Sequence, residues 1–386
     1  MTIALMLLTA ALVFCGATLM TTNNINIMLS DDGRVINAKI DEMGKLVDAN
    51  FYEETDQKAI LDGIAKGYIT ALGDRYSTYL TDSEHAADDI NKAGKREGIG
   101  ITVVIDQDTH YMYVTEVVPN GPAHRAGILA GDQISAVGDL AVTAENYTEA
   151  FSAIAGEQGT TVVLTLARPD APVQRTVVRG QYEAQAVTYK MLGDIAYIKI
   201  NTFNRLTYTQ FTDALDNILP TAKAILFDLR NNSGGFMDEA FKILDEICPA
   251  GTLASAQYKT GEPKVMSTSD ANEIKLPMAV LANGETASAA ELFVAAIRDF
   301  EKGPVIGEKT YGKGVMQTTY TLKDKSAIRI TVAHFLPPGG ETFHNIGIEP
   351  QQIVTPTDEQ RKYFYKLNET NDPFIMAGMA YLQGVK

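Results

Sequence analysis

The pattern of apolar residues changes twice along this chain of 386 residues, and each change marks a different kind of folding unit. Residues 31–96 carry apolar side chains at helical spacing, as at Ile36 and Ile40. Residues 97–181 are rich in β-branched and aromatic strings such as GIGITVVID and YMYVTEVV. From residue 182 onward, short apolar strings alternate with helical patterns, which predicts a mainly parallel or mixed sheet covered by helices. We therefore expect an α/β protein with a helical N-terminal region and a small β-rich domain.

The N-terminal helical region is expected to begin with two helices. The string LGDRYSTYLTDSE then supplies turn residues, and a short charge-rich helix up to Glu97 should follow. This region looks structural or regulatory, because it lacks a recognisable catalytic motif.

The first 20 residues, MTIALMLLTAALVFCGATLM, contain no charged side chain. A run of that length can span a bilayer or form the apolar part of a signal peptide. Small residues around Gly16 would suit cleavage after Ala17, although the usual basic residues before the apolar run are missing. We expect residues 1–22 to be a signal peptide or a membrane anchor, which would place the protein outside the cytoplasm.

Charge and composition exclude several classes of function. The formal net charge is −15 and is spread along the chain, so a nucleic-acid backbone would be repelled. Two cysteines cannot build a disulfide framework or a multi-cysteine metal site. The five histidines form no HExxH motif. We expect no metal, no other cofactor and no nucleic-acid partner.

Residues 97–181 resemble a PDZ domain, and the string VPNGPAHRAGILAGD, from Val118 to Asp132, is the most specific part of that match. Such a domain accepts an extended peptide as an added strand, while the amides of a glycine-rich loop bind the terminal carboxylate. The matching loop is Gly98-Ile99-Gly100-Ile101. The alternative is that these glycines only permit a tight entry into a strand. The resemblance implies that protein C-termini are the ligand.

Two motifs in the last 205 residues lie where a strand runs into a loop. In FDLRNNSGG, Gly235 can present its N–H to a pocket because no side chain blocks the approach. In TASAAE, Ser288 stands where a helix begins, so the N–H of Ala289 and the helix dipole could face a developing oxyanion. Taken alone, each motif has an ordinary alternative: a structural turn for the first and a helix cap for the second.

A third motif, TYGKGVMQ, contains a candidate base for Ser288, the residue Lys313. Lys313 could accept a proton if its pKa fell by about three units, and burial among apolar groups can cause shifts of that size. Gln317 could orient the amine, but it lies about 13 Å along a straight strand and would need a bend at Gly314. The alternative for Lys313 is that it is a surface lysine in a glycine turn. The alternative for Gln317 is that it is an ordinary polar residue of a strand.

Together, the three motifs behind a PDZ-like domain resemble the carboxyl-terminal processing peptidases, or tail-specific proteases. The resemblance covers roughly residues 35–350. It implies an α/β fold with a crotonase-like protease core over residues 182–386, into which the PDZ domain is inserted. Ser233 stands where many members have proline, and Thr286 and Ala290 replace serines of the common SASASE string. None of these changes removes a reacting group.

The resemblance also assigns roles and partners. It implies a serine endopeptidase with Ser288 as nucleophile, Lys313 as general base and Gln317 orienting that lysine. Gly235 and Ala289 take the oxyanion-hole positions, and Asp299 is a supporting acidic residue. The family is extracytoplasmic and often membrane-anchored, and in it the terminal segments often assist homodimerisation and an adaptor protein can be needed.

Two other classes of protein remain open at this point. One is a catalytically silent PDZ receptor that keeps the protease fold only as a scaffold. The other is a hydrolase with a Ser/His pair that uses His334 or His344.

Overall fold

The computed structural model describes residues 31–168 and 171–385, so the segment 1–22, with its expected signal peptide or anchor, lies outside the described residues. The chain divides into two compact units, one ending at Ile64 and the other beginning at Ala65. In the described part of the chain, no helix combines the length and apolar character needed to cross a membrane.

Helices dominate the N-terminal region, as the sequence predicts. They are α2 (Asp31–Asn50), α3 (Gln57–Thr70) and α4 (Asp82–Lys92). Thr81 and Glu84 form a capping box at the start of α4. The prediction that this helix continues to Glu97 was wrong. It ends at Lys92 because Gly94 turns the chain with a φ of +76°, and Lys95–Gly98 instead forms strand β2.

A six-stranded antiparallel sheet with two short helices forms the small β-rich domain. Its sheet has the order β3-β4-β5-β7-β8, with β6 paired to β5. The elements are β3 (Ile101–Ile105), β4 (Met112–Val117), α5 (Pro122–Arg125), β5 (Gln133–Val137), β6 (Leu140–Ala141), α6 (Tyr147–Ile154), β7 (Thr161–Leu166) and β8 (Val173–Val178). It has a buried core of its own. The ribbon of β2 and β9 (Gly180–Glu183) links it to the rest of the chain.

The core domain is built on a six-stranded sheet of order β10-β11-β12-β15-β16-β19, parallel except for the antiparallel β10. The strands are β10 (Val187–Leu192), β11 (Ile195–Ile200), β12 (Ala224–Asp228), β15 (Met278–Ala282), β16 (Val305–Gly307) and β19 (Gln352–Ile353). Strands β12 and β15 are buried along their whole length, which fits central parallel strands covered on both faces.

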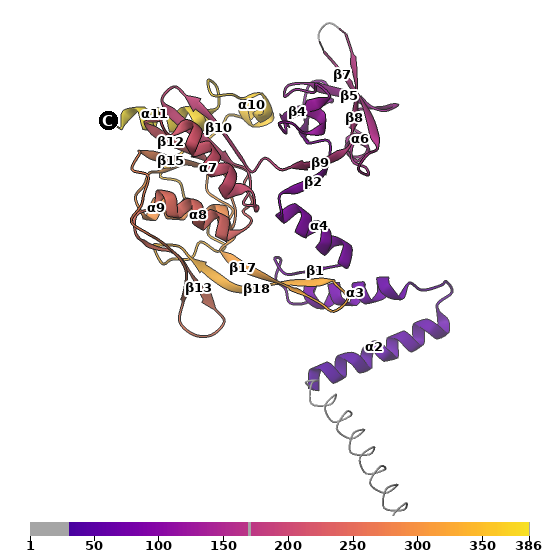
Figure 1. Ribbon diagram of the computed structural model, residues 1–386. Helices are drawn as coiled ribbons and strands as arrows, with labels where there is room; N and C mark the ends of the chain where they lie inside the picture. Colours follow the sequence, from indigo (N-terminus) through magenta and orange to yellow (C-terminus); the bar gives the residue numbers. More distant parts are fainter. Residues whose placement is uncertain (1–30, 169–170, 386) are drawn as a thin grey trace, which may run out of the picture. The chain divides into compact units, whose positions relative to one another are not determined.

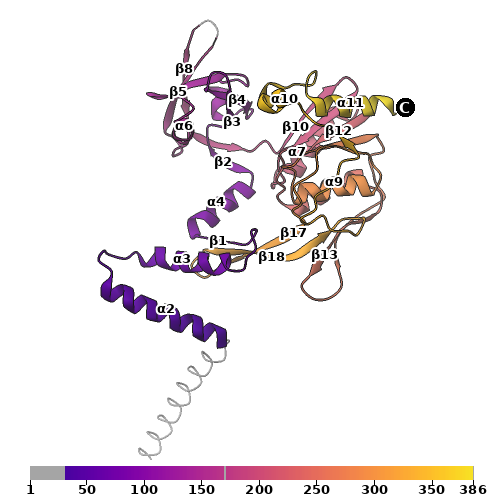
Figure 2. The same ribbon diagram turned by 180° about the vertical axis from the view of Figure 1, so that it is seen from behind.

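Helices cover both faces of this sheet. One face packs on α7 (Thr207–Ile218), α8 (Met237–Ile247) and α9 (Ala289–Asp299), which contribute to one large apolar cluster. The other face packs on α11 (Pro373–Gly384) through Phe374, Ile375 and Leu382. Figure 1 shows α9 and α11 on different sides of β15, and Figure 2 shows them on different sides of β12. The α/β class predicted from the alternating pattern is confirmed.

A second sheet has the order β1-β18-β13-β14, with β17 paired to β18. Its strands are β1 (Thr78–Leu80), β13 (Gly251–Tyr258), β14 (Lys264–Ser269), β17 (Val315–Thr321) and β18 (Ala327–Leu336). Because β1 pairs with β18 through Thr78 and Arg329, a segment from early in the chain is fixed next to late strands. The remaining elements, α10 (Asp358–Lys362) and the 3-10 turn Phe364–Lys366, precede α11.

A buried charged cluster joins the end of β12 to the start of α11. Arg230 pairs with Asp228, and its Nη1 lies 2.9 Å from Asp372 Oδ2. Asp228 also accepts a hydrogen bond of 2.7 Å from the Tyr197 hydroxyl. Asp372 caps α11 by accepting from the N–H of Phe374 at 2.9 Å. One carboxylate therefore both caps the C-terminal helix and fixes it to the loop after β12.

We predict that Asp372→Ala lowers the free energy of unfolding by about 2–4 kcal/mol. It breaks one arm of a buried ion pair and removes a helix cap, while Asp228 still pairs with the guanidinium. Chemical denaturation measures the loss. The control is Asp358→Ala, the same change at an exposed residue in the first turn of α10, where the loss should stay below about 1 kcal/mol. Equal losses in the two variants would contradict the role of the cluster.

Candidate active site

Ser288 lies on the turn between β15 and α9 and is the residue just before the helix. Its backbone has φ 59° and ψ −120°, an unfavourable conformation for a residue with a side chain. Such strain persists where the surroundings enforce it, and it is often found at functional sites. Here the loop after β12 enforces it: the N–H of Ala287 donates to Asn232 O at 2.9 Å, and the Thr286 hydroxyl donates to Leu229 O at 2.9 Å.

The glycine pair of the first motif packs directly against this turn. A Cβ on Gly234 would lie 2.9 Å from Ser288 Cβ and 3.0 Å from the Ala289 nitrogen. A Cβ on Gly235 would lie 2.1 Å from Phe203 O, so only glycine fits there. The Gly234 N–H is already donated to Asn232 at 2.8 Å. The Gly235 N–H donates to no group in the described ranges, so it is free to act as a donor, and its oxyanion-hole role with Ala289 stays a prediction.

Glu291, in the first turn of α9, joins the serine turn to the lysine loop. Its Oε2 accepts from the backbone N–H of Ser288 at 2.9 Å and from that of Lys313 at 2.8 Å. Its Oε1 accepts from the Thr310 hydroxyl at 2.6 Å and the Gly312 N–H at 2.7 Å. The side chain is fully buried, and burial raises the pKa of the Glu291 carboxyl although the four hydrogen bonds oppose that change. Ser288 and Lys313 are neighbours because they share this carboxylate.

Lys313 is half-buried in the loop before β17. Burial lowers the pKa of its amine, and the nearby Arg329 charge lowers it further, while the Asp74 and Glu291 carboxylates act in the opposite direction. The direction agrees with the requirement that a general base be neutral. In this conformation the amine lies over the Tyr76 ring, 5.1 Å from its centroid. No hydrogen bond among the described residues joins it to Ser288.

Gln317 lies on β17 beside the lysine loop, and no hydrogen bond among the described residues joins it to the amine. Its amide donates to Val315 O at 3.3 Å and to the Thr331 hydroxyl at 3.2 Å. A register shift between Met316 and Gln317 bends the strand at this point. The role of Gln317 as the orienting residue therefore stays a prediction.

Asp299 is not brought to Ser288. It lies at the opposite end of α9, about 15 Å away along a helix of this length. Its carboxylate accepts from the Gly339 N–H at 2.8 Å and from the neighbouring Arg298 at 2.7 Å. Its contacts support the loop at residue 339, not the reacting groups.

The two histidines of the Ser/His alternative lie on the lysine side of the site. Their rings are 5.0 Å apart, and the ring of His344 is 6.1 Å from that of Tyr76. Burial lowers the pKa of His344, and its Nδ1 is buried without a hydrogen-bond partner in the described structure. Neither ring is hydrogen-bonded to Ser288 in the described ranges, so the geometry does not favour a Ser/His pair.

The glycine loop of the β-rich domain leads into β3, an edge strand of its sheet. Gly98 and Gly100 have φ of +136° and +77°. The N–H groups of Ile99 and Gly100 donate to no other group within the described residues, whereas their carbonyls accept from Ala123 and Val118 at 2.8 and 2.9 Å. Free amides beside an open strand edge suit a terminal carboxylate and an added strand. Ile99 itself is buried in the domain core, so its side chain cannot read a ligand.

A cavity of about 1020 Å³ lies between this loop and the core domain. Gly100 and Ile101 line it from one side, and Asn201, Asp228 and Asn283 line it from the other. These three residues follow or end β11, β12 and β15, so the cavity lies at the carboxyl ends of the parallel strands. The Ser288 turn follows the same end of β15.

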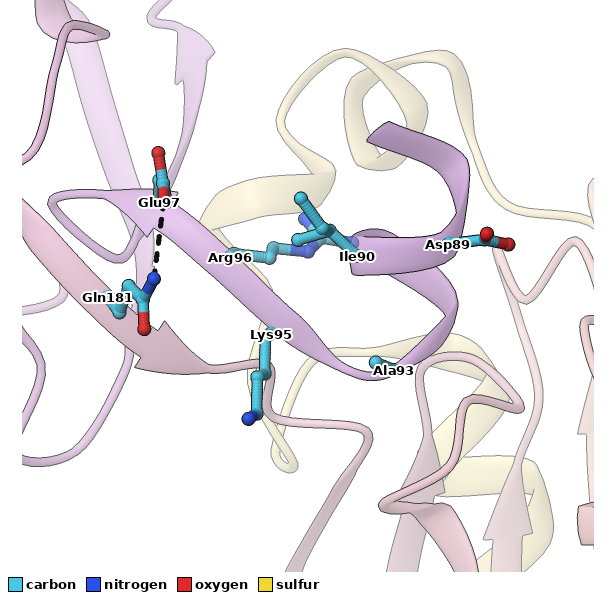
Figure 3. Close-up of a pocket in the computed structure, with 7 residues that line it drawn as sticks. All are labelled: Asp89, Ile90, Ala93, Lys95, Arg96, Glu97 and Gln181. Atoms are coloured by element: carbon cyan, nitrogen blue, oxygen red, sulfur yellow. Dashed lines mark hydrogen bonds between the residues drawn. The ribbon is translucent and has the colours of Figure 1, made fainter. Parts of the chain in front are cut away.

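A smaller pocket of about 290 Å³ lies between α4 and the β2–β9 ribbon and contains none of the predicted site residues. Figure 3 shows its lining, with Gln181 hydrogen-bonded to Glu97. In the part of the chain that the structure describes, there is no group of three or more His, Cys, Asp or Glu side chains that could hold a metal ion.

Glu291 is the residue that sequence reasoning missed. The available signal was the spacing Ser-x-x-Glu in SAAE, which is the pattern of a capping box at a helix start. That pattern predicts the contact with Ser288. It does not predict the contacts with Gly312 and Lys313, because those depend on the tertiary fold.

Comparison with known proteins supports the assignment of both domains. Residues 194–354 match the model of peptidase family S41, and residues 89–167 match the PDZ domain. The chain is 33% identical over 351 residues to the carboxy-terminal processing protease CtpA of Bacillus subtilis, covering 89% of this chain and 75% of that protein. It is 31% identical over 320 residues to a probable CtpA-like serine protease of Staphylococcus aureus, covering 82% of this chain and 64% of that protein.

Solved structures show the same architecture. The photosystem II D1 C-terminal processing protease matches with a TM-score of 0.51 and 26% identity, covering 80% of this chain and 86% of that one. A putative S41 protease from Bacteroides fragilis matches with a TM-score of 0.62 and 18% identity, covering 87% of this chain and 93% of that one, which shows the shared fold. The predicted crotonase-like protease fold with an inserted PDZ domain is confirmed. The chain belongs to the S41 family of serine peptidases, in the CtpA-like group of C-terminal processing proteases.

Proposed function

We propose that this peptidase cleaves peptide bonds with Ser288 as nucleophile and Lys313 as general base, and that its PDZ domain recognises the C-terminal tails of its substrates. The observation that carries the proposal is the shared carboxylate: the N–H groups of Ser288 and Lys313 both donate to Oε2 of Glu291. This contact holds Ser288, with its strained backbone, and the half-buried Lys313 close together in the same site.

In the proposed reaction, the neutral Lys313 amine accepts the hydroxyl proton while Ser288 Oγ attacks the carbonyl carbon of the scissile bond. The negative charge that forms on the carbonyl oxygen is stabilised by the N–H groups of Gly235 and Ala289. The ammonium then gives its proton to the leaving amine, and water hydrolyses the acyl-enzyme. In this conformation the amine lies over the Tyr76 ring.

The proposed substrate tail adds to the edge of β3, and its terminal carboxylate binds the amides of the loop from Gly98 to Ile101. The cavity next to this loop supports the proposal, because it extends from Gly100 to the strand ends that precede the serine turn. A bound tail would thus have a route toward the core domain. This arrangement also supports an enzyme over a silent PDZ receptor, since both halves of the proposed dyad are present.

The remaining partners and the location are proposals that rest on the sequence and the family. The uncharged residues 1–20 support export and membrane attachment, and therefore extracytoplasmic substrates. Exposed apolar side chains on α2, among them Met43 and Leu46, support the expected homodimer and offer a surface for an adaptor protein.

We predict that Ser288→Ala and Lys313→Ala each abolish peptide cleavage while the protein stays folded, because each removes one half of a cooperating pair. Lys313→Arg should also be inactive, since guanidinium stays protonated at any working pH. In the wild type, kcat/KM should rise with pH through a pKa below 10.5, because only the neutral amine accepts a proton. The assay is hydrolysis of a fluorogenic peptide.

The exposed His334 provides the control for this series. His334→Ala should keep nearly full activity, and loss of activity there would instead favour the Ser/His pair. A folded Lys313→Arg variant that still cleaves would contradict the dyad, because it would show that the site needs positive charge and not a base.

We predict that Glu291→Gln reduces kcat/KM by about 100-fold or more and lowers the free energy of unfolding by about 2–4 kcal/mol. Glutamine offers one acceptor oxygen where four donors converge, and its amide hydrogens would face some of those donors. Peptide hydrolysis and chemical denaturation measure the two effects. Glu285→Gln, an exposed change in the same turn, should alter neither quantity appreciably. Activity near the wild-type value in Glu291→Gln would refute its role.

We predict that amidating the C-terminus of a substrate slows its cleavage by roughly tenfold or more. The amide removes the anion that the loop from Gly98 to Ile101 would bind, and a hydrogen bond to a charged group contributes about 1.5–3 kcal/mol. The measurement compares kcat/KM for a free-acid peptide and its amide with the same internal cleavage site. Equal values would rule out tail recognition and leave an endopeptidase that reads only the sequence around the cleaved bond.

A further inference from the structure

The segment Asp74-Arg75-Tyr76-Ser77 has no assigned role, yet the fold places it beside Lys313. It directly precedes β1, which pairs with β18 through Thr78 and Arg329. Strand β18 also pairs with β17, which begins two residues after Lys313. The strand pairing therefore carries an N-terminal segment to the lysine loop.

Hydrogen bonds hold this segment in a defined conformation. Asp74 accepts from the Tyr76 N–H at 3.0 Å and from the Ser77 hydroxyl at 2.6 Å. Ser77 Oγ in turn accepts from the backbone N–H of Thr331 on β18 at 3.1 Å. The hydroxyl of Thr331 accepts from Gln317 at 3.2 Å. The same short network thus supports the Tyr76 ring and the predicted orienting residue.

The Tyr76 ring is half-buried and has cations against it. The Lys313 amine lies 5.1 Å from its centroid, and the Arg75 guanidinium carbon lies 4.7 Å from it. Arg75 also donates a hydrogen bond to the Tyr76 hydroxyl. The negative face of an aromatic ring attracts an ammonium group, and the attraction is larger where the pair is desolvated. The ring therefore favours the protonated amine over the neutral one.

The charged and titratable groups around the amine and the Tyr76 ring come from four parts of the chain. Asp74 and Arg75 belong to the segment before β1, Arg329 to β18, Glu291 to α9, and His344 to the loop after β18. Burial and Arg329 favour the neutral amine, whereas the two carboxylates favour the ammonium. The Tyr76 ring carries no charge, but like the two carboxylates it favours the ammonium form of Lys313.

We propose that Tyr76 is a positioning residue for Lys313. Its ring holds the amine in a fixed place next to the serine turn and raises the pH at which the amine becomes a base. The proposal rests on the proposed function, because it concerns the group assigned there as general base. Proton transfer itself stays between Ser288 and Lys313, and Tyr76 gains or loses no proton.

The first test is the pH dependence of kcat/KM for peptide hydrolysis. Tyr76→Leu keeps an apolar cover but has no aromatic face, so the ammonium loses stabilisation and the acid limb should move to lower pH by about 0.4–1.5 units. Tyr76→Phe keeps the face, and its acid limb should stay within about 0.3 units of the wild type. Tyr320→Leu, the same change at an exposed position on β17, should leave the limb unchanged. An unshifted or upward-shifted limb in Tyr76→Leu would overturn the proposal.

The second test does not depend on activity. Lysine amines of the intact protein are converted to ¹³C-dimethylamines, and the Lys313 resonance is identified by its absence in Lys313→Arg. The ring face should shift this resonance upfield of the other lysines in the wild type and in Tyr76→Phe, and the shift should vanish in Tyr76→Leu. A wild-type Lys313 resonance at the position of exposed lysines would overturn the proposal even if Tyr76→Leu fails to fold.

The two proposals fail in different ways. If Lys313 is not the base, Lys313→Ala stays active, whatever the methyl resonance shows. If Lys313 is the base but Tyr76 does not position it, Lys313→Ala is inactive while Tyr76→Leu has the wild-type pH profile and no ring shift is seen.

Discussion

One buried carboxylate holds the candidate site together. Glu291 accepts four hydrogen bonds, two from the lysine loop backbone, one from the Ser288 N–H and one from the Thr310 hydroxyl. A buried carboxylate is costly unless its acceptors are satisfied, so the loop and the turn are both fixed by the need to satisfy it. The position of Lys313 beside the serine turn is a consequence of this interaction, while the strained backbone of Ser288 is also held by the loop after β12.

The parallel sheet provides the frame on which this interaction depends. Strands β12 and β15 are fully buried and end side by side, so the glycine loop after the first lies against the serine turn after the second. The second sheet adds the lysine loop through β17 and the segment at Tyr76 through β1. The site is therefore built from segments distant in sequence, each ending or beginning at a strand.

Much of this arrangement could be predicted from the sequence, because the signals were local. Alternating apolar strings indicated the α/β core, and the motifs around Gly235, Ser288 and Lys313 indicated the site. The helix predicted to reach Glu97 ended early because one glycine turned the chain. The contacts of Glu291 with the lysine loop, and of Tyr76 with the amine, depend on strand pairing between distant segments, which no local pattern encodes.

The central claim is that Lys313 removes the proton from Ser288. The most direct measurement is the rate at which a fluorophosphonate reagent labels Ser288 at different pH values. Mass spectrometry of the peptide that contains Ser288 measures the labelled fraction. The account predicts a rate that rises with a single ionisation below the ordinary lysine pKa and that is lost in Lys313→Met. Labelling that is equally fast in Lys313→Met would contradict it.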